Sequence, residues 1–155
     1  MKIQRIYTDT SVIGGVFDKE FATWSNGLFE DLKSDNFKLV VSEVVSAEIE
    51  NAPEYVKNFY KKLLTLEVEI VKITNEATKL ANTYQSQQIL TEKFYDDGLH
   101  IALATIAEVD VLVSWNFKHI VNFNKIRLFN SVNLALGYKQ IQIYSPREVT
   151  TYEQG

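Results

Sequence analysis

Four side chains suited to binding a hard cation stand where packing would favour an apolar residue. The carboxylate of Asp9 follows an apolar-leaning segment, and Asn116 follows the buried-looking segment 109–113. Glu48 and Asp97 lie at the margins of apolar helix faces in "SEVVSAEIEN" and "KFYDDGLHIALATIA". A carboxylate in such a place is costly to bury unless it is paired, protonated or bound to a metal. An amide oxygen can also bind a hard cation or its water.

Two of these positions, and the neighbouring His100, also have an ordinary structural interpretation. Asp9 suits an Asx turn or a helix cap, and Glu48 suits an edge residue that pairs with a lysine. Asp96 stands four residues before His100, which predicts a surface Asp–His pair. His100 more often bonds a backbone carbonyl than a metal when it lies near a core. No single position therefore decides between structure and chemistry.

The elements that must position these residues alternate between strand and helix. Strands are expected at 2–9, 37–42, 67–73, 109–115 and 141–145. Helices are expected between them, at 11–17, 20–33, 42–50, 53–66, from 74 onward, 91–108 and 124–138. The hydroxyls of Thr10 and Ser11 suit the N-cap of the first helix. This alternation predicts an α/β sandwich around a mostly parallel sheet, with ligand sites at the carboxyl ends of its strands.

Composition narrows the class of protein. The 155 residues are 46% apolar and 23% charged, which suits one globular domain over residues 1–155. The sequence has no cysteine, so any metal must be bound by oxygen or imidazole. It has neither a long apolar run nor a signal peptide, so we expect a cytoplasmic protein without a membrane segment. The net charge of −4 disfavours a basic nucleic-acid-coating protein, but not a nuclease whose carboxylates gather cations.

Four segments, taken in order, resemble the PIN-domain ribonucleases, which include the VapC-like toxins of VapBC toxin–antitoxin pairs. These segments are "YTDTSVIGG", "LVVSEVVSAEI", "DDGLHIALAT" and "VDVLVSWNFKHI", and they span almost the whole chain. The resemblance implies a three-layer α/β/α sandwich with a parallel sheet of four to five strands. It also implies a metal-dependent endoribonuclease that hydrolyses RNA phosphodiester bonds.

The resemblance further implies roles for individual residues. Asp9, Glu48 and Asp97 match the acids that hold one or two Mg²⁺ or Mn²⁺ ions, and Thr10 or Ser11 matches a supporting hydroxyl. Asn116 stands where many members carry a fourth acid, and this difference affects whether a second metal ion binds and how tightly. The catalytic set expected from the resemblance is therefore Asp9, Glu48, Asp97 and Asn116.

Partners are expected on the same basis. Lys118 and His119 come soon after Asn116, at the end of the last of the four segments, and Arg127 lies a little further on. These three residues suit contacts with the RNA substrate or ordinary surface charge. Trp115 could stack on a base, although packing is the commoner role for such a residue. An antitoxin protein that covers the site and a homodimer are further expected partners.

Two other functions remain open at this stage. Asn116 favours a catalytically weakened PIN-like module that binds RNA or protein, whereas the retained acids favour an enzyme. A phosphatase of the haloacid-dehalogenase type also begins with an Asp after its first strand. That family needs a second Asp two residues later, where this chain has Ser11.

Overall fold

The computed structural model describes residues 2–151, and its centre is a five-stranded sheet in which all strands are parallel. The spatial order of the strands is β3-β2-β1-β4-β5. Their bounds are Arg5–Thr8 for β1, Lys38–Ser42 for β2, Val68–Val71 for β3, Val111–Val113 for β4 and Ile143–Tyr144 for β5. β1 is thus the central strand, and it pairs with β2 through Tyr7 and Val40 and with β4 through Tyr7 and Leu112.

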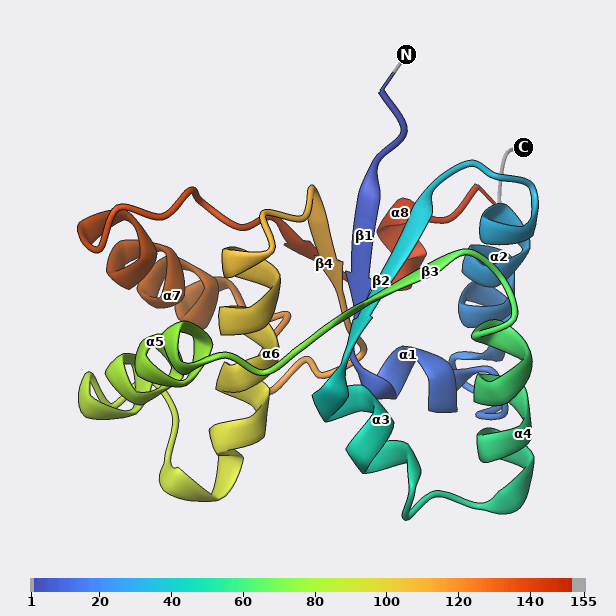
Figure 1. Cartoon of the computed structure of the whole chain (residues 1–155), viewed down its shortest axis with the longest axis horizontal. Helices are drawn as coiled ribbons and strands as arrows, with labels where there is room; N and C mark the ends of the chain where they lie inside the picture. Colours follow the sequence, from blue (N-terminus) through green and yellow to red (C-terminus); the bar gives the residue numbers. More distant parts are fainter. Residues whose placement is uncertain (1, 152–155) are drawn as a thin grey trace.

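Helices cover both faces of the sheet (Figure 1). On one side lie α5 (Asn75–Ser86), α6 (Tyr95–Ile106) and α7 (Phe123–Ala135). On the other lie α1 (Thr10–Gly15), α2 (Ala22–Lys33), α4 (Glu54–Leu63) and α8 (Pro146–Val149), with α3 (Glu43–Ile49) following directly on β2. A short 3₁₀ helix, η1 (Glu92–Phe94), precedes α6. No helix within residues 2–151 is long and apolar enough to cross a membrane.

Strand side chains alternate between two hydrophobic cores, one on each face. Tyr7 and Leu112 join the core under α5, α6 and α7, whereas Ile6 and Val113 join the core under α1, α2 and α4. This period of two is the pattern of strands that are buried on both faces. The three-layer α/β sandwich predicted from the sequence is therefore confirmed.

Three local features differ from the predictions. The N-cap of α1 is Asp9, and its side chain makes no capping bond. Thr10 and Ser11 were expected to cap this helix, but they lie inside it, and their hydroxyls contact the acids described below. The helix expected at 91–108 is divided into η1 and α6. The sequence patterns did not predict α8, which begins with a capping box between Ser145 and Glu148.

A glycine allows α1 to approach the rest of its core. A Cβ atom on Gly15 would lie 2.6 Å from Ser25 Oγ and 2.8 Å from Trp115 Nε1, whereas one on Gly14 would meet nothing within 4 Å. We expect Gly15→Ala to lower the free energy of unfolding by about 1–3 kcal/mol through overpacking. Gly14→Ala should raise it by up to about 1 kcal/mol, because alanine favours the helix. Urea denaturation of both variants measures the difference, and equal effects would contradict the close approach.

Candidate acidic site

The carboxyl ends of β1 and β4 bring Asp9 and Ser114 together at one edge of the sheet. The side chain of Asp9 is 4% exposed, and both of its oxygens accept hydrogen bonds. Ser11 Oγ donates to Oδ1 over 2.6 Å, and Ser114 Oγ donates to Oδ2 over 2.7 Å. Ser11 Oγ also accepts from the backbone N–H of Trp115. A buried carboxylate is thus held in one orientation by hydroxyls from α1 and from the end of β4.

The surroundings of Asp9 do not favour its charged form. Burial raises the pKa of Asp9 above its ordinary value, and the nearby charge of Glu48 raises it further. The charge of His100 and the bonds from Ser11 and Ser114 act in the opposite direction without cancelling the increase. The protein therefore holds this carboxylate at an energetic cost, as is common at functional sites.

Glu48 reaches the same region from the second turn of α3, which starts where β2 ends. Its Oε1 accepts from Thr10 Oγ1 over 2.7 Å and is 2.8 Å from His100 Nε2. An ionised carboxylate can only accept, so Nε2 of His100 carries the proton of that bond. Neither bond uses Oε2, and the side chain of Glu48 is 36% exposed. Glu48 is therefore anchored through one oxygen.

A buried chain of hydrogen bonds holds the imidazole of His100 on its Nδ1 side. Its Nδ1 lies 2.6 Å from the hydroxyl of Tyr7, which lies 2.8 Å from Ser42 Oγ. Tyr7 is fully buried and His100 is 2% exposed. Side chains from β1, the end of β2, α6 and α3 are therefore joined in one polar network within the protein.

The pair of Glu48 and His100 favours its charged state. Burial lowers the pKa of His100, but the bond to Glu48 and the charges of Asp9, Glu48 and Asp97 raise it above the ordinary value. Burial likewise raises the pKa of Glu48, but the bond and charge of His100 and the bond from Thr10 bring it below its usual range. The predicted pair of Asp96 and His100 is wrong, because both imidazole nitrogens are engaged elsewhere and Asp96 is exposed.

Asp97 enters the site from the first turn of α6. Burial raises the pKa of Asp97 to about 6, and the charges of Asp9 and Glu48 contribute to the increase. His100 and a hydrogen bond from the side chain of Asn116 lower it in part. The other end of the Asn116 amide, Oδ1, accepts from the backbone N–H of His119 over 2.9 Å. Asn116 therefore links Asp97 to the loop that follows β4.

The raised pKa of Asp97 gives a pH prediction for the metal-free protein. Between about pH 4 and pH 6 the folded state binds more protons at Asp97 than the unfolded state, so stability from this group falls as pH rises. Asp97→Asn should therefore raise the free energy of unfolding at pH 7 by about 1–2 kcal/mol, after allowance for solvent screening. Urea denaturation with a chelator at pH 7 and pH 4 measures this gain, which should disappear at pH 4. The exposed Asp96→Asn serves as the control, and an equal gain there would contradict the assignment.

The oxygen atoms of the site are of the kind that binds a hard divalent cation, but hydrogen bonds within the protein already occupy several of them. Carboxylate and amide oxygens are the ligands that Mg²⁺ and Mn²⁺ prefer. Within residues 2–151, however, no three His, Asp or Glu side chains are grouped so that they could hold one metal ion. Asp9 is bonded to two serines, and Glu48 is turned toward His100. The structure thus brings Asp9, Glu48 and Asp97 into mutual electrostatic contact without forming a complete coordination shell.

The residues predicted to contact RNA have different surroundings. Lys118 and Arg127 are exposed, whereas His119 is 8% exposed and both of its ring nitrogens are buried. Trp115 is also buried: its ring stacks on Phe21 at 4.2 Å, and its Nε1 donates to Ser25 Oγ. Trp115 is therefore a packing residue, as the commoner interpretation of its position held.

The sequence patterns did not predict two residues of the site, Ser114 and Tyr7. They also predicted Asp96 as the partner of His100, in place of Tyr7 and Glu48. Ser114 follows β4 directly, and the argument from strand ends that selected Asp9 would also have found Ser114. Tyr7 looked like a core residue of β1, and nothing in the local sequence predicted the partners of its hydroxyl. The Tyr7–His100–Glu48 chain joins residues that are far apart in sequence, so only the fold shows it.

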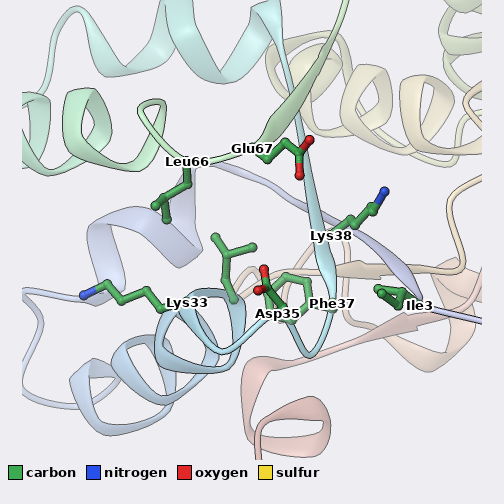
Figure 2. Close-up of a pocket in the computed structure, with 8 residues that line it drawn as sticks. Ile3, Lys33, Asp35, Phe37, Lys38, Leu66 and Glu67 are labelled. Carbon is green, nitrogen blue, oxygen red and sulfur yellow. The ribbon is translucent and has the colours of Figure 1, made fainter.

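The opposite edge of the sheet carries a cavity of about 400 Å³ (Figure 2). It is lined by Ile3, Leu32, Lys33, Asp35, Phe37, Lys38, Leu66 and Glu67. The charged ends of Lys33 and Lys38 point away from each other in Figure 2. Ile3 and Lys38 lie at the amino-terminal ends of the first two strands, whereas Asp9 lies beyond the carboxyl end of β1. This cavity is therefore separate from the acidic site.

Comparison of the sequence with protein-family models and with curated proteins gives no match. Solved structures do resemble the chain. VapBC2 from Rickettsia felis, bound to a DNA fragment from its promoter, has a TM-score of 0.60 and 17% identity over 91% of this chain and 98% of that one. VapBC-1 from nontypeable Haemophilus influenzae has a TM-score of 0.57 and 20% identity over 92% and 98%. Mycobacterium tuberculosis VapC20, a toxin that cleaves the sarcin–ricin loop, has a TM-score of 0.54 and 14% identity over 88% and 98%. The chain therefore has the PIN-like fold of VapC toxins, as its motifs predicted.

Proposed function

We propose that this protein is a divalent-metal-dependent endoribonuclease and the toxin of a toxin–antitoxin pair. The observation that carries the proposal is the convergence of Asp9, Glu48 and Asp97, whose charges act on one another, at the carboxyl edge of a PIN-like sheet. A cation bound among the three carboxylates would offset the repulsion between their charges. The similarity in fold to VapC20, which cleaves the sarcin–ricin loop, supports nuclease chemistry.

The cation, Mg²⁺ or Mn²⁺, would be held by Asp9 and Asp97, with Oε2 of Glu48 as a third ligand. When bound, such an ion polarises the phosphate and activates water. The protein's own groups keep the acids in place: Ser11 and Ser114 orient Asp9, and His100 and Thr10 orient Glu48. The amide of Asn116 lowers the pKa of Asp97 and so favours its charged form. The assignment of Asp9, Glu48 and Asp97 as metal ligands stays a prediction.

An antitoxin is the proposed protein partner, because the solved structures of similar fold include a toxin–antitoxin complex. A homodimer, RNA as the substrate and a cytoplasmic location are parts of the same proposal.

The test of this function is RNA hydrolysis by the purified full chain. Labelled single-stranded RNA should be cut in the presence of Mg²⁺ or Mn²⁺, remain intact with a chelator, and be cut again when the metal is restored. Cleavage that continues at the same rate in the chelator would contradict the proposal.

A module that binds RNA or protein without cleaving is the second candidate. It is favoured by the bond between Glu48 and His100, which occupies one predicted ligand, and by Asn116 in place of a fourth acid. The cleavage assay above separates the two candidates, because a binding module would leave RNA intact under all three conditions.

A further inference from the structure

A surface of cations and aromatic rings lies beside the acidic site, and we call it the Phe94 surface. It consists of Lys93, Phe94 and Lys118, and a second pair, Phe123 and Arg127, lies at the start of α7. The Nζ atoms of Lys93 and Lys118 lie 5.6 and 5.8 Å from the centre of the Phe94 ring. The guanidinium of Arg127 lies 5.7 Å from the Phe123 ring, which is 75% exposed. The Phe94 ring is half-buried, whereas the Phe123 ring is exposed. Aromatic rings with cations beside them are groups on which single-stranded nucleic acids bind.

Two segments form this surface, and the same two segments form part of the acidic site. Phe94 stands three residues before Asp97, and Lys118 stands two residues after Asn116. Phe94 and Lys118 contact each other, so these two segments meet close to Asp97 and Asn116. The Phe94 surface therefore begins within one helical turn of a proposed metal ligand.

His119 holds the ring of Phe94 in place. The two ring centres are 3.9 Å apart, and the planes are inclined by 33°. Both ring nitrogens of His119 are buried without a hydrogen-bond partner among the described residues. Its pKa is lowered by burial and by the charges of Lys118 and Lys125, which favours the neutral imidazole. His119 therefore acts as an apolar support for Phe94 and not as a polar contact.

The segment that carries Lys118 and Arg127 has a charge opposite to that of the whole chain. Residues 111–147 contain five of the sixteen Lys and Arg residues and none of the twenty Asp and Glu residues. This complementarity to a polyanion favours RNA over a protein partner as the occupant.

We propose that the Phe94 surface binds single-stranded RNA next to the acidic site, and that the strand continues to the pair of Phe123 and Arg127, with bases stacked on Phe94 and Phe123. The ammonium groups of Lys93 and Lys118 and the guanidinium of Arg127 contact the phosphates. This inference rests on the proposed function, because it assigns the path by which the RNA substrate reaches the acids.

The test measures binding in the absence of cleavage. The full chain is titrated into fluorescent single-stranded RNA of about 12 nucleotides in a chelator, and anisotropy is followed between about 50 and 200 mM salt. Phe94→Leu keeps the apolar packing and removes the ring, whereas Phe94→Tyr keeps the ring. Lys118→Glu reverses one charge of the surface. The control is Lys38→Glu, an exposed lysine at the opposite edge of the sheet (Figure 2).

Phe94→Leu and Lys118→Glu should each weaken binding by about fivefold or more, and Lys118→Glu should make the salt dependence shallower. Phe94→Tyr and Lys38→Glu should bind like the wild type. The inference is overturned if the wild type does not bind, or if the Phe94 and Lys118 variants match Lys38→Glu, which would leave this surface to a protein partner. Failure of the proposed function gives a different result: RNA bound through Phe94 and Lys118 but not cut when metal is added.

Discussion

Asp9→Asn should lower the rate of RNA cleavage by about three orders of magnitude, on the scale seen when a group that stabilises charge at a reacting centre is removed. Asp9 lies at the end of the central strand, where its two oxygens are oriented by Ser11 and Ser114. Because the carboxylate is buried and its pKa is raised, the neutral amide should not destabilise the metal-free fold. Single-turnover cleavage of a labelled RNA, with circular dichroism to confirm folding, measures the loss.

Two further variants show whether the loss follows from the geometry of the site. Ser114→Ala removes a hydrogen bond to Asp9 and should slow cleavage by about 10- to 100-fold, as is usual for a residue that orients a metal ligand. Asp96→Asn changes an exposed carboxylate next to Asp97 and should leave the rate unchanged. A folded Asp9→Asn protein that cleaves at nearly the wild-type rate would refute the role given to Asp9.

His100→Leu should lower the free energy of unfolding by about 2–4 kcal/mol, because it leaves buried partners of the imidazole without their hydrogen bonds. Tyr7 would lose a 2.6 Å contact inside the protein, and Glu48 would lose its only described ion-pair partner. Urea denaturation at pH 7 with a chelator measures the change.

The other histidine of the chain provides a matched control. The ring nitrogens of His119 are buried without a partner among the described residues, so His119→Leu removes unsatisfied groups and should change stability little. A double-mutant cycle with Glu48→Gln should show that His100→Leu costs less when the carboxylate is absent. Equal losses from the two histidine substitutions would show that the hydrogen-bond chain does not contribute as described.

The sequence was sufficient to predict features that depend on strand direction. Asp9 directly follows β1, and Ser114 to Asn116 directly follow β4. Because the carboxyl ends of parallel strands lie at one edge of the sheet, the meeting of these two chain segments could be predicted without coordinates. Ser42 and Thr74 cap α3 and α5, which also follows from local chemistry.

The partners of buried polar groups could not be predicted in this way. His100 lies on α6 and Glu48 on α3, and only the packing of both helices around β1 and β2 brings the two side chains within 2.8 Å. His119 was predicted to contact the substrate because it comes soon after Asn116, yet the fold packs its ring against Phe94. Local spacing fixes the face of an element on which a side chain lies, whereas its partner depends on the neighbouring element.

The central claim is that the three acids form a site for a divalent cation, and calorimetric titration tests it most directly. Mn²⁺ is titrated into the metal-stripped wild type and into Asp9→Asn, with both proteins shown to be folded by circular dichroism. We expect the wild type to bind Mn²⁺, the heat of binding to be lost in Asp9→Asn, and Mn²⁺ to raise the melting temperature of the wild type alone. No binding to the wild type, or equal binding to both proteins, would contradict the claim.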